Sequence, residues 1–246
     1  MGDARAARAR SFGGAADAYA AGRPTYPAEA IAWLVDGAHR VVDVGAGTGK
    51  LTAGLLAAGC DVVAAVDPDP GMLAVLERAV PAVPALVGTA ESVPLPDASA
   101  DAAVLGQAWH WVDPDAASAE LGRVVRSGGV LGLVWNIRDE RVPWVAELGA
   151  VMDGSDAERM IGEGRVRVAP PFGALTEHRV RWSVPRTPDE IVAMASSRSS
   201  LIAMTEEERA GVLDRIRRLL ATHPATAGRD RIELPYVTHA FRAVRD

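Results

Sequence analysis

Cysteine and lysine are almost absent from this sequence. The 246 residues contain one cysteine, Cys60, so the chain can form no internal disulfide and no metal site built from several thiolates. A single thiol suits a reducing compartment, and we expect a cytoplasmic protein. Lys50 is the only lysine. Basic charge is carried by arginine instead, and together with abundant Ala and Gly this is typical of a GC-rich bacterial genome.

Long apolar segments and an excess of positive charge are also missing. No run approaches the roughly 20 apolar residues of a membrane-spanning helix, and the Arg- and Ala-rich start of the chain lacks the apolar region of a secretory signal. Asp and Glu number 32 against 26 Lys and Arg, a net charge of −6. General nucleic-acid binders carry a basic surface instead. We expect neither a membrane nor a nucleic acid as a partner.

Several catalytic motifs are absent as well. The sequence has no H-x-x-x-H pair, no G-K-[ST] loop and no G-x-S-x-G elbow, which excludes the corresponding zinc, nucleotide-hydrolysing and serine-hydrolase sites. His39, His178, His223 and His239 lie at no metal-ligand spacing. We expect no metal site.

What the sequence does contain is 49% apolar residues, enough for a sizeable core. Between residues 41 and 135, β-branched segments alternate with helical stretches, which predicts a Rossmann-like, doubly wound and mostly parallel α/β sheet. Strands are expected at Val41–Val44, Asp61–Val66, Ala85–Val87, Ala102–Leu105 and Val130–Trp135. Helices are expected at Lys50–Ala58, at Met72–Ala79, and from Pro114 to about Val125 with Gly128 and Gly129 as its stop.

The rest of the chain has a different pattern. We expect a helix at Pro143–Met152, a Gly- and Arg-rich connector, a strand at His178–Val184, helices at about 188–203 and 205–221, and a last strand at Ile232–Val244, which makes seven strands. Helical segments at about 27–36 and 188–221 do not fit the alternation of strands and helices, and we expect them to cover the ligand-binding edge of the sheet. The expected organisation is one domain, 1–246, with a helical lid at 1–38, a cofactor-binding core at 39–136, and a C-terminal part at 137–246 that contains a lid insertion at 188–221.

Three glycines follow the first expected strand in the segment V-V-D-V-G-A-G-T-G-K. Gly45, Gly47 and Gly49 form G-x-G-x-G, whereas the dinucleotide fingerprint is G-x-G-x-x-G, so Lys50 stands where that motif needs its last glycine. A glycine loop between a strand and a helix lets a ligand approach free N–H groups. Asp67 closes the next strand about 20 residues on, a position from which a carboxylate can accept hydrogen bonds from ribose hydroxyls.

Four segments in order carry a family resemblance: V-D-V-G-A-G-T-G, V-D-P-D-P-G-M-L, G-T-A-E-S-V-P-L-P-D-A-S-A-D, and an N-terminal pattern made of Phe12, Ala16, Tyr19, Arg23, Pro24, Tyr26 and Pro27. From Val41 to Asn136 the chain resembles the class I S-adenosylmethionine-dependent methyltransferases. It is most similar to their small-molecule branch, which includes UbiE-like and trans-aconitate-methyltransferase-like enzymes. The resemblance implies S-adenosyl-L-methionine as cofactor.

The resemblance also implies roles for single residues. Asp43 would hold the cofactor's ammonium, the loop Gly45, Ala46, Gly47 and Gly49 its methionine and ribose, and Asp67 its ribose hydroxyls. Pro68, Met72, Ala90 and Glu91 would border the adenine. Thr89 stands where many relatives have Asp, which implies a weaker bond to the adenine amine. Gln107 would face the methionine end.

The segment Gln107-Ala108-Trp109-His110-Trp111 follows the fourth expected strand and so lies at the ligand edge. His110 is our candidate for a base or an orienting group, with pocket packing as the alternative. Trp109 and Trp111 are candidate walls. Substrate contacts are also expected from Asn136, with a turn role as the alternative, and from Tyr19, Arg23 and Tyr26 of the N-terminal lid. Arg23 could pair with an acidic substrate or the cofactor's carboxylate, or equally form a structural ion pair. A pocket for an anion could be formed by further arginines, most of which are expected at the surface: Arg138, Arg141, Arg165, Arg167 and Arg198.

These observations predict an enzyme that transfers a methyl group to an O or N atom of a small organic acceptor by in-line displacement. Secondary metabolism is the expected setting, and we expect a monomer or a homodimer. Two alternatives stay open. The chain could bind S-adenosylmethionine without methylating, as a scaffold or a cyclase that uses the sulfonium charge. It could also be a nicotinamide-dependent oxidoreductase.

Overall fold

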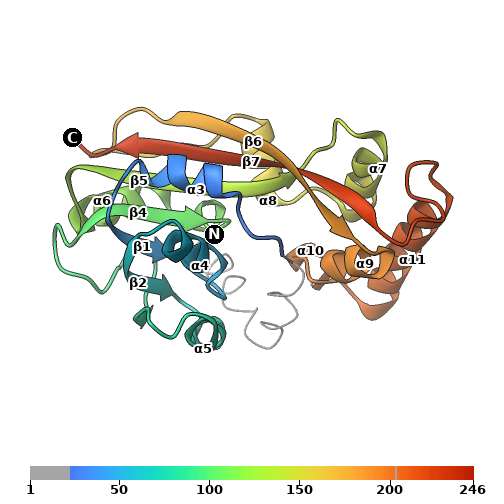
Figure 1. The fold of residues 1–246 in the computed structure, drawn as a ribbon, viewed down its shortest axis with the longest axis horizontal. Helices are drawn as coiled ribbons and strands as arrows, with labels where there is room; N and C mark the ends of the chain where they lie inside the picture. Colours follow the sequence, from blue (N-terminus) through green and yellow to red (C-terminus); the bar gives the residue numbers. More distant parts are fainter. Residues whose placement is uncertain (1–22, 203) are drawn as a thin grey trace.

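Seven strands form one sheet in the computed structural model, which describes residues 23–202 and 204–246. The strand order is β3-β2-β1-β4-β5-β7-β6, with β1 to β5 parallel and β7 antiparallel to both β5 and β6 (Figure 1). This confirms the Rossmann-like α/β fold. The strands are β1 (Arg40–Val44), β2 (Asp61–Asp67), β3 (Ala85–Val87), β4 (Ala100–Gly106), β5 (Val125–Arg138), β6 (Thr176–Arg186) and β7 (Ile232–Val244).

The helices begin where the sequence supplies N-terminal caps. Asp69 and Asp113 accept backbone N–H groups at the starts of α5 and α6, and Ser155, Thr187 and Thr205 form capping boxes with Glu158, Glu190 and Glu208. The described helices are α3 (Ala28–Val35), α4 (Lys50–Ala57), α5 (Pro70–Ala79), α6 (Pro114–Val124), α7 (Pro143–Met152), α8 (Asp156–Gly162), α9 (Pro188–Ser196), α10 (Ser199–Ile202), α11 (Glu206–Thr222) and the 3-10 helix η2 (Trp109–Trp111).

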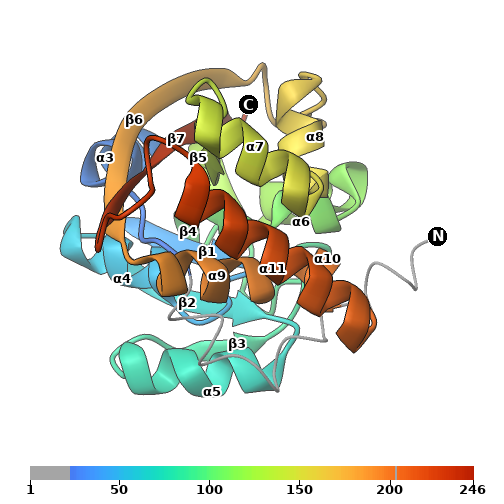
Figure 2. The same cartoon turned by 90° about the vertical axis from the view of Figure 1, so that its right-hand side faces the viewer.

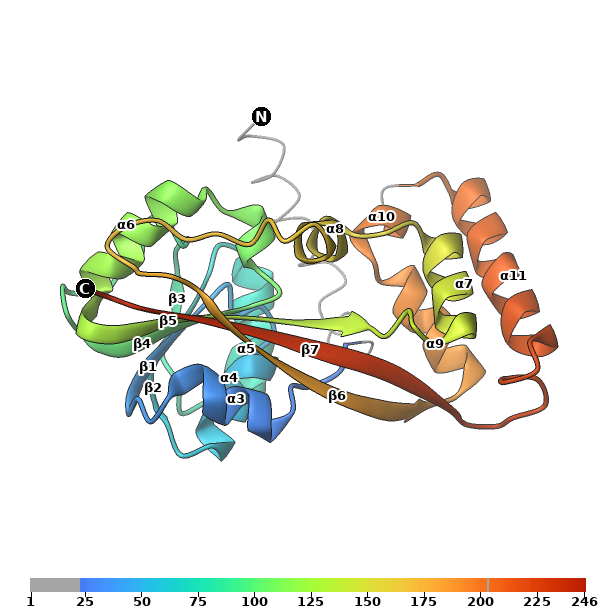
Figure 3. The ribbon, with the colours of Figure 1, turned by 90° about the horizontal axis from the view of Figure 1, so that it is seen from above.

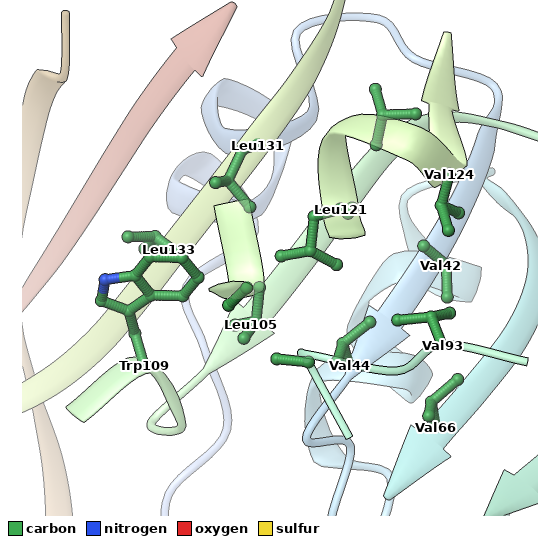
Figure 4. Packing of buried hydrophobic residues seen from close by; sticks show 14 of the residues in the cluster. Val42, Val44, Val66, Val93, Leu105, Trp109, Leu121, Val124, Leu131 and Leu133 are labelled. Atoms are coloured by element: carbon green, nitrogen blue, oxygen red, sulfur yellow. The ribbon is translucent and has the colours of Figure 1, made fainter. Parts of the chain in front are cut away.

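Each face of the sheet has its own apolar core. On one face Leu131 and Leu133 of β5 pack with Leu105, Trp109 and Leu121, beneath α6 (Figure 4). On the other face, helices α3, α4 and α5 bury a second cluster that includes Leu34, Leu55, Leu76, Val41 and Val134. Successive side chains of a strand alternate between faces, so the near-continuous apolar runs of β1, β2 and β4 are what a sheet covered on both sides requires.

A third apolar core lies beyond the parallel strands. Strands β6 and β7 pair over eleven residues and run past the core to a cluster of helices, where α11 packs against α7 and α9 (Figures 2 and 3). Helix residues of this cluster, such as Ile191, Leu148 and Ile216, pack with Leu234 and Tyr236 of β7. The strands thus connect the helical cluster directly to the ligand edge of the sheet.

Three expectations about single elements were wrong. Gly128 and Gly129 do not stop a helix: α6 ends at Val124, and the two glycines lie inside β5, where the register against β4 shifts. The connector after α7 contains a helix, α8, opened by the Ser155–Glu158 capping box. The segment 188–203 forms two helices instead of one, α9 and α10.

Part of the expected N-terminal lid lies elsewhere. Helix α3 packs on the face of the sheet against β5, β6 and β7, beside α4, where Leu34 contacts Gly132 of β5. It therefore belongs to a layer of the fold, whereas residues 23–27 cross the sheet edge. Among the described residues, no helix combines the length and apolar character needed to cross a membrane.

Candidate functional site

The glycine loop joins the end of β1 to the start of α4. Gly45, Gly47 and Gly49 all have positive φ (69°, 55° and 84°), a conformation in which side chains are strained. The backbone N–H groups of Gly45 and Ala46 both donate to the carbonyl of Val66, which ties the loop to the end of β2. Every second residue of the loop adopts a left-handed conformation, which favours glycine, and this explains the G-x-G-x-G spacing.

The three glycines differ in what surrounds them. A Cβ atom at Gly45 would lie 2.6 Å from Ala108 Cβ, and one at Gly49 would lie 2.9 Å from Leu76 Cγ. At Gly47 a Cβ would meet no atom of the described chain within 4 Å. Gly45 and Gly49 are therefore required by internal packing, whereas Gly47 faces open space and leaves its backbone accessible to a ligand.

Asp43 is a fully buried carboxylate beneath this loop. Its Oδ2 accepts a hydrogen bond from Thr52 Oγ1 at 2.6 Å, but its Oδ1 is buried with no hydrogen-bond partner in the part of the chain that the structure describes. Burial raises the pKa of Asp43 to about 7, against the opposing effect of the Thr52 hydroxyl. A buried acceptor without a partner is costly, and a ligand that brings a cation or donor would satisfy it.

Asp67 holds the loop from the next strand. Its Oδ2 accepts the N–H of Gly47 at 2.8 Å and its Oδ1 accepts the N–H of Asp69 at 2.9 Å. Burial raises the pKa of Asp67 despite these two bonds. Each carboxylate oxygen can accept more than one hydrogen bond, so Asp67 retains acceptor capacity beside the open Gly47.

The residues expected around the adenine follow β2 and β3. Met72 and Ala90 are buried, and the Thr89 N–H pairs with the carbonyl of Ser92 in a short bridge. Glu91 Oε1 accepts the N–H of Asp113 at 2.9 Å, so this side chain anchors the start of α6. Pro68 lies half-buried between Asp67 and Asp69.

Gln107 and Asn136 connect the ends of β4 and β5. Gln107 has φ +57° and donates through Nε2 to the carbonyl of Asn136 at 3.1 Å. The Asn136 side chain donates to the carbonyl of Thr25 and accepts from Thr238 Oγ1 at 2.7 Å. Its amide thus fixes the segment that enters α3 through both of its polar atoms, and the substrate contact expected of Asn136 stays a prediction.

Residues 23–27 run above the same edge. A Cβ at Gly106, the last residue of β4, would lie 2.6 Å from the hydroxyl oxygen of Tyr26, which places this phenol over the strand end. Arg23 is half-buried and close enough to Arg198 to affect it electrostatically. Tyr19 lies outside the described residues.

The two tryptophans of η2 have different surroundings. Trp109 is 2% exposed within the first apolar core and donates its indole N–H to the carbonyl of Arg167 at 2.9 Å, so it supports the edge from below. Trp111 is half-buried and packs against the ring of His110, with ring centroids 4.6 Å apart. Of the two predicted walls, Trp111 is the one beside the imidazole.

His110 has a defined tautomer in this arrangement. Its Nδ1 lies 3.3 Å from the indole Nε1 of the fully buried Trp135. An indole N–H can only donate, so Nδ1 must be the acceptor and the neutral ring carries its proton on Nε2. In this state Nε2 is a hydrogen-bond donor and has no lone pair with which to remove a proton.

Several residues of this edge are not among those predicted from the sequence. Thr52 and Thr238 hold Asp43 and Asn136, yet an isolated threonine in a helix or strand is indistinguishable from a solvent-facing one. Glu158, which pairs with Arg138 and Arg198, lies in the region taken for a connector. Here the S-D-A-E capping signature at residues 155–158 was the available signal.

Comparison with known proteins identifies the family. A model of the "Methyltransferase domain" family matches residues 42–133, which span the glycine loop and the strands around it. A protein of Mycobacterium tuberculosis (strain ATCC 25618 / H37Rv), named as an uncharacterized methyltransferase, is 52% identical over 234 residues, 95% of each chain. This chain belongs to the class I S-adenosylmethionine-dependent methyltransferases. S-adenosylmethionine is accordingly its cofactor.

The likeness of this methyltransferase to its relatives extends beyond the core. An uncharacterized methyltransferase-like protein of Schizosaccharomyces pombe is 32% identical, with 93% of each chain covered. A solved structure from Anaeromyxobacter dehalogenans, provisionally named a type II methyltransferase, is 28% identical with a TM-score of 0.66, and the match covers 91% of this chain and 97% of that one. The methyltransferase family replaces the nicotinamide alternative that the three glycines left open.

Proposed function

We propose that this methyltransferase transfers the methyl group of S-adenosylmethionine to an O or N atom of a small organic acceptor at the edge formed by β1, β2, β4 and β5. The observation that carries the proposal is the buried Asp43 Oδ1, which has no hydrogen-bond partner among the described residues and lies on the strand that leads into the glycine loop. Asp43 offers a site for the cofactor's ammonium, and the missing side chain at Gly47 leaves room for the ribose.

The residues present fit the cofactor's groups. Asp43 would hold the ammonium, the Gly47 peptide would lie against the ribose, and Asp67 would accept from the ribose hydroxyls with its remaining lone pairs. The cofactor supplies a methyl carbon already activated by a sulfonium leaving group. What remains for the protein is to position the acceptor in line and to exclude water, both of which lower the barrier without acid or base catalysis.

On the acceptor side, we assign His110 an orienting role. Because Trp135 keeps the proton on Nε2, His110 can donate a hydrogen bond to an oxygen or nitrogen lone pair of the acceptor. Such a bond would fix the acceptor beside Trp111 and Gln107. A base role would require the Trp135 bond to break first.

This assignment predicts a difference between two substitutions. His110→Ala should lower turnover by roughly 10- to 100-fold, the worth of one positioned hydrogen bond. His110→Asn, whose amide still donates, should retain most of the activity, and both variants should bind S-adenosylhomocysteine as the natural chain does. Steady-state kinetics with an acceptor identified by screening provide the measurement. If the Asn variant is as inactive as the Ala variant, the imidazole acts as a base.

The function itself is tested by calorimetry and methyl transfer. The purified chain should bind S-adenosylmethionine and S-adenosylhomocysteine, and should move a labelled methyl group from the donor to members of a panel of small acids, alcohols, phenols and amines. Absence of binding for both cofactor forms would end the proposal. If the chain binds the cofactor but transfers the labelled methyl group neither to any acceptor of the panel nor to any component of a cell extract, the non-methylating alternative would be favoured.

A further inference from the structure

Two buried arginines share one carboxylate at the end of β5. Arg138 Nη2 lies 2.7 Å from Glu158 Oε1, and Arg198 Nη2 lies 2.9 Å from Glu158 Oε2; the two arginine side chains are 5% and 6% exposed. Burial alone would raise the pKa of Glu158, but the guanidiniums of Arg138 and Arg198 reverse this and bring it to about 2. Glu158 is therefore ionised, and the three side chains carry one net positive charge.

More positive charge gathers around the same place. The guanidiniums of Arg23 and Arg186, together with those of Arg138 and Arg198, all lie close enough to the buried hydroxyl of Tyr236 to act on its pKa, which burial nevertheless raises. Arg186 is paired only loosely with Glu190, at 3.8 Å. It also faces Lys50, whose pKa is lowered by burial and by Arg186. Among the described residues, the buried cations Arg138 and Arg198 outnumber their shared carboxylate Glu158, and such an excess is unfavourable unless something compensates it.

Within residues 23–202 and 204–246, one donor of the cluster has no acceptor. Arg138 Nε is buried and forms no hydrogen bond with these described residues, although Glu158 holds the guanidinium. A buried N–H without a partner is unfavourable, and a ligand oxygen that accepts from it would remove this penalty. Arginine presents its donors as a planar fork that matches the two oxygens of a carboxylate or phosphate.

The cluster lies next to the proposed methyl-transfer edge. Arg138 is two residues beyond Asn136 on β5, so both side chains leave the same face of the strand, and their partners on β7 are Tyr236 and Thr238. Arg198 comes from the turn between α9 and α10 of the helical cluster, and Arg23 from the segment above the strand ends. Residues from the core, the N-terminal segment and the helical cluster thus converge beside Asn136.

We propose that the methyl acceptor carries an anionic oxygen group, a carboxylate or a phosphate, and that Arg138 and Arg198 hold this group while Glu158 fixes the two guanidiniums. The proposal rests on the proposed function and names the class of its substrate. S-adenosylmethionine brings one carboxylate of its own, so the test below is made with the cofactor site already filled.

Calorimetry with small probes tests the site directly. After saturation of the protein with S-adenosylhomocysteine, succinate or inorganic phosphate is titrated in, and neutral succinamide serves as the matched control. We expect saturable binding of succinate or phosphate and none of succinamide. The anion that binds with the higher affinity shows whether the site prefers a carboxylate or a phosphate. Absence of binding by both anions while S-adenosylhomocysteine binds would overturn the anionic-acceptor proposal and leave the proposed function standing. Failure of S-adenosylhomocysteine to bind would instead reject the proposed function.

Charge-changing variants separate a ligand site from a structural ion cluster. Arg198→Gln should weaken binding of the preferred anion at least about tenfold, since a charge-assisted bond is lost. Glu158→Gln keeps a side chain suited to the capping box of α8 but releases both guanidiniums, so anion binding should tighten several-fold. Arg217→Gln, in which an exposed arginine of α11 loses its pair with Asp214, is the control and should change nothing. A folded Arg198→Gln or Glu158→Gln protein with unaltered anion affinity would refute the proposal.

Discussion

Below pH 7, the affinity of this methyltransferase for S-adenosylmethionine is expected to fall about tenfold for each pH unit, because Asp43 has a pKa of about 7. In the apo protein at lower pH the buried carboxyl holds a proton, and the cofactor's ammonium can pair with it only after that proton leaves. Binding at pH 6 should therefore release close to one proton. Above roughly pH 8 the α-amino group of the cofactor loses its own charge, so affinity should fall again.

Isothermal titration calorimetry in buffers of different ionisation enthalpy measures both the affinity and the number of protons released. Asp43→Asn is the matched control, since it keeps an acceptor for Thr52 while removing the titration, and it also separates Asp43 from the neighbouring Asp67. This variant should bind more weakly at pH 7.5 and show no rise in affinity between pH 5.5 and 7. A natural chain with pH-independent affinity over that range would exclude an ammonium contact at Asp43.

The same group makes a prediction for the apo protein. The folded-state pKa of Asp43 is raised above its unfolded value of 3.8, so the folded protein binds the proton more tightly than the unfolded chain. Its contribution to the free energy of unfolding is therefore complete below pH 4 and is lost as the pH rises through 7. Urea unfolding of the natural chain and of Asp43→Asn measures this. The free energy of unfolding of the natural chain, relative to that of Asp43→Asn, should decrease as the pH rises through 7.

Asp67→Ala is expected to weaken cofactor binding by about 1–3 kcal/mol, a factor of roughly 5 to 150. Two effects add: the ribose loses its acceptor, and the N–H of Gly47 loses the carboxylate that orients the loop. Calorimetry with S-adenosylhomocysteine measures the change. Asp61→Ala, at the exposed start of the same strand, serves as the control.

The intermediate variant Asp67→Asn distinguishes these two effects. An asparagine oxygen can still accept one backbone N–H, so the loop should retain part of its order while the charged contact to the ribose is lost. We expect an affinity between those of the natural chain and Asp67→Ala. Unchanged affinity in the alanine variant would remove Asp67 from the cofactor site.

The sequence predicts the core of this fold well because its signals are local. β-Branched runs ending in Gly or Asp-Pro mark β1 and β2, and Asp113-Pro114 marks the start of α6. Strand β5 is longer than its apolar run indicates, because antiparallel pairing with β7 carries it on to Arg138. Such pairing depends on a partner more than 90 residues away, so no local pattern reveals it.

The candidate site also combines local and long-range signals. The sequence predicts Asp43, Gly47 and Asp67 as cofactor contacts because a strand end, a glycine and an acid at fixed spacing form a pattern along the chain. The tautomer of His110 depends on Trp135, and the environment of Arg138 depends on Glu158 and Arg198. An arginine that looks solvent-exposed in a sequence is distinguished from a buried one only by what the fold brings to it.

The long pairing of β6 with β7 has a consequence for which molecules this enzyme accepts. A ribbon bonded over eleven consecutive residues resists bending, so it keeps a constant spacing between the helices at its far end and the strand ends of the sheet. On β5, which pairs with β7, Asn136 and Arg138 lie roughly 7 Å apart, two residues of extended chain. Under the proposal that Arg138 holds an anionic group, this rigid frame would favour acceptors in which the methylated atom lies at a fixed distance from that group.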